Sequence, residues 1–81
     1  MTQEQLNKII ENHQHYLNKD IDGWESMKAD LSDKNLSGLD LRNANLIEAD
    51  LSNASLSNSN LRNANLNNAN LREANLYGAN L

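Results

Sequence analysis

The side chains that could do chemistry in this 81-residue sequence are few, and their spacing does not gather them into a catalytic group. The sequence contains no cysteine, which excludes a thiol nucleophile, a thiolate metal ligand and a disulfide. It also lacks a glycine-rich phosphate loop and a Gly-x-Ser-x-Gly nucleophile motif. We therefore expect neither enzymatic activity nor a cofactor. The carboxylates of the C-terminal part are dispersed, at Asp30, Asp33, Asp40, Glu48, Asp50 and Glu73.

The two histidines, His13 and His15, are the remaining candidates for metal binding. On a helix, residues two apart point about 200° away from each other, so these side chains cannot hold one ion together. Helical metal-binding pairs are three or four residues apart. We expect no metal site, with His13 as a polar member of a packed helix face and His15 as a solvated surface residue.

The composition excludes further classes of protein. The net charge is −4, and residues 29–81 carry six acids and four bases, so we expect no nucleic-acid binding. No apolar run approaches the roughly 20 residues that cross a bilayer, and the N-terminus lacks the apolar core of a signal peptide. We expect a cytoplasmic protein without a membrane contact.

The elements that position these side chains follow from a leucine that recurs every five residues. Residues five apart rotate by about 140° on a helix and alternate between the faces of a strand. All these leucines can be buried together only if the chain turns between them and coils around its own core as a solenoid. The expected core leucines are Leu31, Leu36, Leu41, Leu46, Leu51, Leu56, Leu61, Leu66, Leu71 and Leu76, and Leu81 ends the series.

The residue two before each leucine is small in nine of the eleven pentads, and we expect it to point inward as well. The exceptions, Lys34 and Leu39, both fall in the first coil, which we expect to be distorted or to lean against the N-terminal segment. The small residues assigned to the core are Ala44, Ala49, Ala54, Ala64, Ala69 and Ala74.

The residue just before each leucine is Asn or Asp in every pentad but one. We expect it at a corner of the coil, where a short polar side chain bonds nearby backbone. Residues 28–46 match the stretch 20 residues later at 12 of 19 positions, which favours four sides per coil. Asn45 would then lie over Asn65, and Asn60 over Asn80, as amide ladders spaced about 4.8 Å apart.

Residues 29–81 resemble the pentapeptide-repeat family, whose motif is roughly Ala-(Asn/Asp)-Leu-x-x. The resemblance implies a mainly β fold, a right-handed quadrilateral β-helix of just under three coils. The motif stands as Ala44-Asn45-Leu46, Ala49-Asp50-Leu51, Ala64-Asn65-Leu66, Ala69-Asn70-Leu71, Ala74-Asn75-Leu76 and Ala79-Asn80-Leu81.

Residues 1–28 form a separate segment, which we expect to be an α-helical cap and a linker. Thr2 and Gln5 have the spacing of a capping box, and the apolar pattern predicts a helix over about residues 3–18. Some bacterial pentapeptide-repeat proteins begin with such a helix and a His-x-x-Trp-Leu-like element, which His13 to Leu17 resembles. We expect the cap to hide the open edge of the first coil through Leu6, Ile9, Ile10 and Leu17, with Trp24 as a plug.

These features favour a protein-interaction or scaffold module whose protein partner the sequence does not identify. The last coil would expose backbone and apolar side chains, so we expect a homodimer through it, unless the natural protein is longer. The expected self-association edge is Leu71, Leu76, Tyr77 and Leu81.

The family offers an alternative function, because some members mimic DNA and bind type II topoisomerases such as DNA gyrase. Just under three coils are about 13 Å tall, a height at which duplex DNA carries about seven or eight phosphate charges. Residues 29–81 carry a net charge of only −2. The alternative therefore fits this chain poorly, unless it is a fragment of a longer protein.

Overall fold

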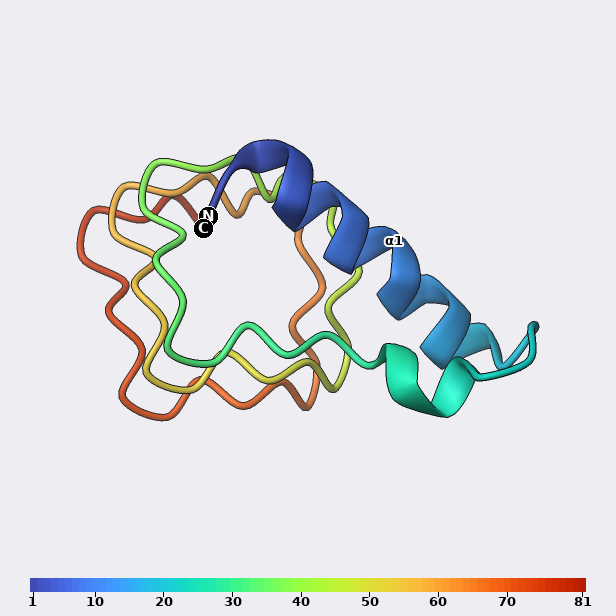
Figure 1. Ribbon diagram of the computed structural model, residues 1–81. Helices are drawn as coiled ribbons and strands as arrows, with labels where there is room; N and C mark the ends of the chain where they lie inside the picture. Colours follow the sequence, from blue (N-terminus) through green and yellow to red (C-terminus); the bar gives the residue numbers. More distant parts are fainter.

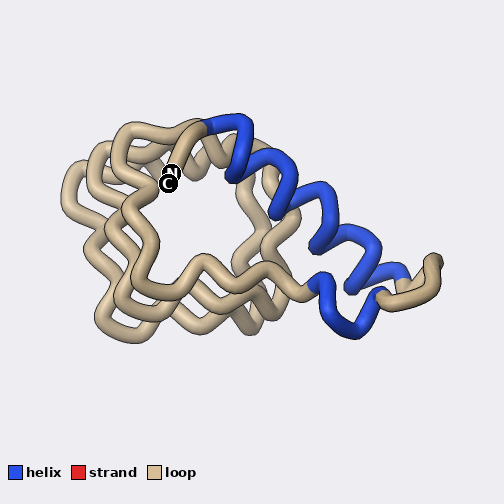
Figure 2. Tube along the Cα trace, in the orientation of Figure 1, coloured by secondary structure: helices blue, strands red, loops and turns tan.

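A computed structural model describes all 81 residues as a helix, a short 3-10 turn and a coil that winds around itself (Figure 1). Helix α1 spans Gln3–Asn18, and the 3-10 helix η1 spans Trp24–Met27. From residue 29 to residue 81 the chain contains no helix and no continuous strand (Figure 2). The whole structure measures 38 × 22 × 21 Å.

Helix α1 begins and ends at signals that are local in the sequence. The predicted capping box is present, since the Gln5 N–H donates to Thr2 Oγ1 (3.1 Å) and the Thr2 N–H donates to Gln5 Oε1 (2.9 Å). These bonds satisfy two of the N–H groups that a helix start leaves open. The helix ends at Lys19, whose left-handed backbone (φ 54°) lets its N–H bond to the His15 carbonyl.

The coil has four sides, as the 20-residue repeat predicts. Seven isolated parallel bridges join residues 20 apart, from Asp30↔Asp50 to Asn60↔Asn80. The structure contains less β structure than the predicted mainly β fold. Each pentad contributes only one bridged residue, and no extended strand forms. A side of five residues that must turn at its end has no room for a longer ladder.

Each corner is made by the two residues after a leucine, and not by the Asn or Asp before it. In the first pentad the Lys34 N–H donates to the Leu31 carbonyl (3.3 Å), which closes a turn through Ser32 and Asp33. The second turn residue has φ between 58° and 72° in all ten pentads, as in a type II turn. It is Asn or Gly in seven of them, the residue types that tolerate this backbone best.

The Asn or Asp before each leucine is the bridged residue, and its side chain braces the corner that follows. In nine of ten pentads its Oδ1 accepts a hydrogen bond from the backbone N–H two residues on, Ser55 being the exception. The predicted stacking of Asn45 on Asn65 is present in the backbone. The predicted amide ladder is absent: no hydrogen bond joins the side chains of Asn45 and Asn65, whose Oδ1 atoms accept from the backbone of their own turns.

Burial of the leucines falls off toward the end of the chain. The seven leucines of the register from Leu31 to Leu61 are at most 3% exposed, and Ala44, Ala49 and Ala54 are buried beside them. Leu66, Leu71, Ala64, Ala69 and Ala74 are only partly buried. Leu76, assigned to the core by its position, lies in the last of these coils and is 37% exposed.

Candidate functional site

The two ends of the coil are the candidate functional site, because there the bridging N–H and C=O groups lack the partners that they have inside the coil. Inside the coil, a bridged residue such as Asp50 donates its N–H to Ala29 O (3.1 Å) and accepts from the Leu31 N–H (2.7 Å). The same two bonds recur at every bridge, always between neighbouring coils. The bridged residues of the first coil have no preceding coil to pair with. In the last coil, the carbonyl before and the N–H after a bridged residue are without a partner.

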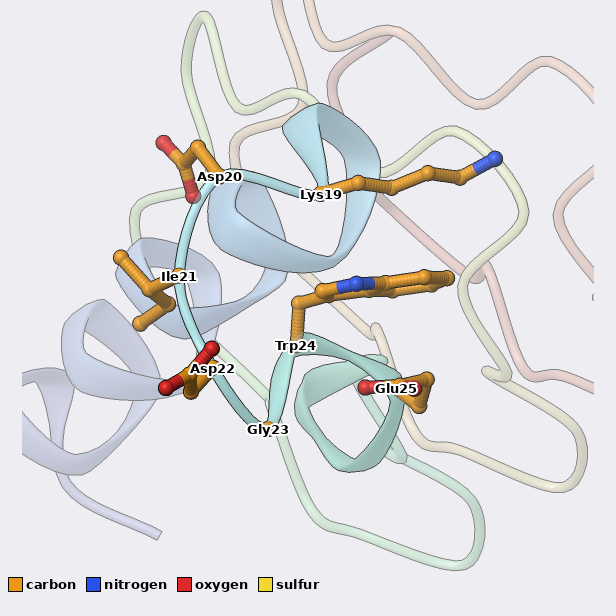
Figure 3. Close-up of a pocket in the computed structure, with 7 residues that line it drawn as sticks. All are labelled: Lys19, Asp20, Ile21, Asp22, Gly23, Trp24 and Glu25. Atoms are coloured by element: carbon orange, nitrogen blue, oxygen red, sulfur yellow. The ribbon is translucent and has the colours of Figure 1, made fainter.

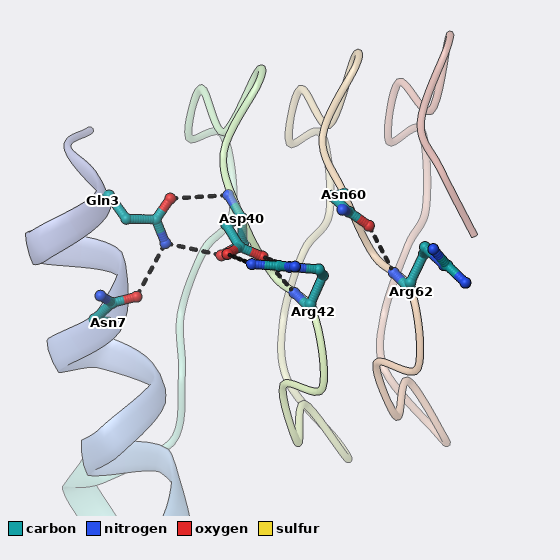
Figure 4. Close-up of polar contacts among 6 residues, drawn as sticks. All are labelled: Gln3, Asn7, Asp40, Arg42, Asn60 and Arg62. Atoms are coloured by element: carbon teal, nitrogen blue, oxygen red, sulfur yellow. Dashed lines mark hydrogen bonds and ion pairs between the residues drawn. The ribbon is translucent and has the colours of Figure 1, made fainter.

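At the N-terminal end, helix α1 replaces the missing coil on two of the four sides. The Gln3 side chain pairs with the backbone of Asp40 in both directions, donating to its carbonyl (2.8 Å) and accepting from its N–H (2.8 Å) (Figure 4). The Gln14 amide donates to the carbonyl of Asn45 on the next side (3.1 Å). Gln3 and Gln14 are eleven residues apart, about three helical turns, so both lie on the face toward the coil.

His13 is fully buried at the contact between α1 and the coil, as the sequence predicted for a polar member of that face. Its Nδ1 accepts from the Ala29 N–H (2.9 Å), and its Nε2 lies 2.7 Å from the Ile47 carbonyl. A backbone N–H can only donate and a carbonyl can only accept, so the ring is neutral with its proton on Nε2. The His13 side chain therefore links Ala29, at the start of the coil, to Ile47 on its fourth side.

The apolar part of the cap is shorter than predicted. Leu6 is fully buried in the same cluster as the coil leucines, and Ile9 and Ile10 pack against that cluster. Leu17 and Trp24 are not part of it. The C-terminal end of α1 extends beyond the coil (Figure 1), so Leu17 in the last helical turn does not reach the core.

Trp24 packs in the turn after α1 and does not plug the coil (Figure 3). The Lys19 ammonium lies 5.4 Å from the centre of the Trp24 ring, and the centre of the Tyr16 ring lies 6.0 Å from the same point. Residues 19–25 line an open hollow of about 360 Å³ there. His15, predicted to be solvated, is half-buried and contacts Asp20 (Nδ1 to Oδ1, 2.9 Å).

At the C-terminal end, the last coil exposes apolar side chains. Leu81 is 72% exposed and Tyr77 is 79% exposed, while Leu71, also assigned to the self-association edge, is partly buried. The N–H groups of Leu66, Leu71 and Leu76 make no hydrogen bond. The carbonyls of Ala64, Ala69 and Ala74 are also unpaired.

The outer faces of the coil carry one ion pair, between Asp40 and Arg42. The Arg42 guanidinium and then the Arg42 N–H bind the Asp40 carboxylate and hold its pKa at about 2, below its usual 3.8 (Figure 4). The Ser32 hydroxyl and N–H lower the pKa of Asp30 in the same way. Arg62, stacked one coil beyond Arg42, has Asn60 in place of an acid and so makes no ion pair.

No group of three His, Cys, Asp or Glu side chains converges into a metal-binding set. None of the helices has the length and apolar character needed to cross a membrane. The two ends of the coil therefore offer a binding partner unpaired backbone N–H and C=O groups and exposed apolar side chains.

Comparison with known proteins identifies the repeat. The profile of the family described as pentapeptide repeats matches residues 27–63 and 49–81, with eight copies. Among solved structures, the crystal structure of alr5209, a pentapeptide repeat protein from Nostoc Pcc 7120, is 34% identical, with a TM-score of 0.47. That match covers 64% of this chain and 55% of the other, so the chain spans about half the length of this relative. No curated protein matches the chain.

Proposed function

The chain belongs to the pentapeptide-repeat family, and on that premise we propose that it is a non-catalytic protein-interaction module that self-associates through its C-terminal coil. We infer from the same membership that the coil is the right-handed quadrilateral β-helix of that family. The 20-residue offset of all seven bridges supports the quadrilateral part of this inference. The observation that carries the functional proposal is the open C-terminal edge.

The donors and acceptors that flank each bridged asparagine of that edge are self-complementary. On each of three sides the last coil presents, in chain order, an alanine carbonyl and then a leucine N–H two residues later. Two such edges related by a twofold axis run antiparallel, so each leucine N–H can donate to the alanine carbonyl of the other copy. This pattern is that of an antiparallel bridge at the Asn between them, namely at Asn65, Asn70 and Asn75.

The same geometry favours a closed dimer over a filament. A head-to-tail contact would place the last coil of one copy on the N-terminal edge of the next. There Gln3 and Gln14 already occupy the backbone of Asp40 and Asn45, and α1 lies across those sides. Contact between two C-terminal ends avoids this obstruction and covers the exposed Leu76, Tyr77 and Leu81.

The alternative, DNA mimicry toward a type II topoisomerase, needs rows of free carboxylates along the coil. Asp30 over Asp50 is one stacked pair, but Asp40 is neutralised by Arg42 and lies under Asn60. No observation favours this alternative, and we do not adopt it.

Sedimentation equilibrium over a hundredfold range of concentration tests the proposal. We expect a single monomer–dimer equilibrium, and we expect the double variant Tyr77→Ser/Leu81→Ser to raise its dissociation constant at least tenfold. Both side chains are largely exposed, so the variant should fold normally. Ile21→Ser, which removes an apolar side chain (42% exposed) from the turn after α1, is the matched control and should leave the equilibrium unchanged. A wild-type monomer at all concentrations would refute the proposal.

A further inference from the structure

The N-terminal end of the coil has two sides that α1 leaves open, at the bridged residues Asp30 and Asn35. Neither the N–H nor the C=O of Asn35 makes a hydrogen bond. Ser55, one coil further on, uses both groups, donating to Lys34 O (2.9 Å) and accepting from the Leu36 N–H (2.7 Å). Asp40, on the next side of the first coil, has both groups capped by Gln3. Asn35 is therefore the unpaired edge of a ladder whose other members are paired.

A groove lies directly beside this edge. It has a volume of about 560 Å³, and Met1, Gln5, Lys8 and Ile9 of the N-terminal segment line one wall while Lys34 lines the other. Its only charged lining residues are the two lysines. Lys34 occupies the position at which nine of the eleven pentads have a small inward residue. One of the two lysine charges in the groove is therefore present because this pentad departs from the repeat motif.

We propose that this groove and the Asn35 edge together bind an extended acidic segment of another protein. The main chain of that segment would pair with the free N–H and C=O of Asn35 and extend the ladder by one bridge, as in β-strand addition to a sheet edge. Its alternate side chains would lie against Ile9 and Met1 and reach Lys8 and Lys34 with carboxylates.

The lysines are available for such a ligand. Lys8 contacts Glu11 only at 3.8 Å, and both side chains of that pair are about two-thirds exposed, so the pair is weak. Lys34 forms no ion pair, and the carboxylate of Asp30, on which its charge acts, is already held by Ser32. An incoming carboxylate therefore displaces no strong contact.

An anionic amphiphile such as a fatty acid shares the charge and the apolar surface of this ligand, but it has no backbone. The free N–H and C=O of Asn35 favour the peptide, because only a peptide satisfies a donor and an acceptor together.

The test is a titration of the full chain, followed by amide chemical shifts, with a short blocked peptide of alternating valine and glutamate. We expect saturable shifts at Lys34, Asn35 and Ile9 with a dissociation constant below about 1 mM. A peptide that is N-methylated at its central residues should bind at least tenfold more weakly. Lys34→Ala should weaken binding about two- to fivefold, the effect of one exposed ion pair.

Lys34→Ala should fold normally, because alanine is the residue that most pentads carry at this position. Arg62→Ala removes the same charge from the second coil, at a residue that does not line the groove, and it should leave the affinity unchanged. The proposal is overturned if no shift appears at Asn35, or if the N-methylated peptide binds as well as the parent. It is also overturned if dodecanoate saturates the groove and the peptide does not.

Discussion

Replacing His13 with phenylalanine isolates the hydrogen bonds that join α1 to the coil, because the variant keeps a ring of similar size. The change leaves the Ala29 N–H and the Ile47 carbonyl without their partners, at a site where His13 is fully buried. An unsatisfied buried polar group costs about 1–3 kcal/mol, so the pair should cost about 2–6 kcal/mol. That is a large part of the total stability expected of a domain this size.

Urea unfolding followed by circular dichroism measures this loss, with His15→Phe as the control. His15 makes one contact, to Asp20, and is only half-buried, so its replacement should cost less than about 1 kcal/mol. In the wild type, long-range nitrogen–proton correlations should show the His13 proton on Nε2. A His13→Phe variant within about 0.5 kcal/mol of the wild type would show that the two bonds do not stabilise the cap.

The remaining predictions concern the corners of the coil. Gly38→Ala should cost about 1 kcal/mol in urea unfolding, since its φ is +72° with open space around it. Gly78→Ala should cost more, because a Cβ there would lie 2.3 Å from Asn58 Oδ1, and Asn58→Ala should remove the excess in a double-mutant cycle. Glu73 has φ 59° and no side-chain partner, so Glu73→Asn should stabilise the chain by up to about 1 kcal/mol in the same assay. The Asp40 pKa of about 2 lies below its unfolded 3.8, so its contribution to stability is complete above pH 3.8 and is lost as the pH falls through 2. Asp40→Asn should flatten the pH dependence of unfolding in that window, and an NMR titration giving Asp40 a pKa near 3.8 would contradict the assignment.

The leucine register and the 20-residue repeat were sufficient to predict the coil, its four sides and its inward residues. A period of five admits few ways to bury every leucine, so the pattern determines the architecture. The start of α1 was predictable for the same reason, since Thr2 and Gln5 form a local signal that no distant contact overrides.

The corner was misplaced because the Asn before each leucine was taken as the turn residue. The informative signal was the second residue after each leucine, where Asn and Gly stand in seven of ten pentads and φ is positive. The roles of Gln3 and Gln14 were missed because they depend on where α1 crosses the coil, which the sequence does not specify. Trp24 was misplaced for the same reason, since the helix extends past the coil before the turn that carries it.

The constant offset of the bridges has a consequence for how the chain folds. Every bridge joins residues 20 apart, so no contact of the coil waits for a distant part of the sequence. Closing a loop of that length costs about 2.7 kcal/mol beyond a fixed term, and the cost is the same for each bridge. During synthesis each new pentad can dock as soon as it emerges, on an edge formed one coil earlier. The coil can thus fold in the order of its translation, with α1 and the first coil as the template.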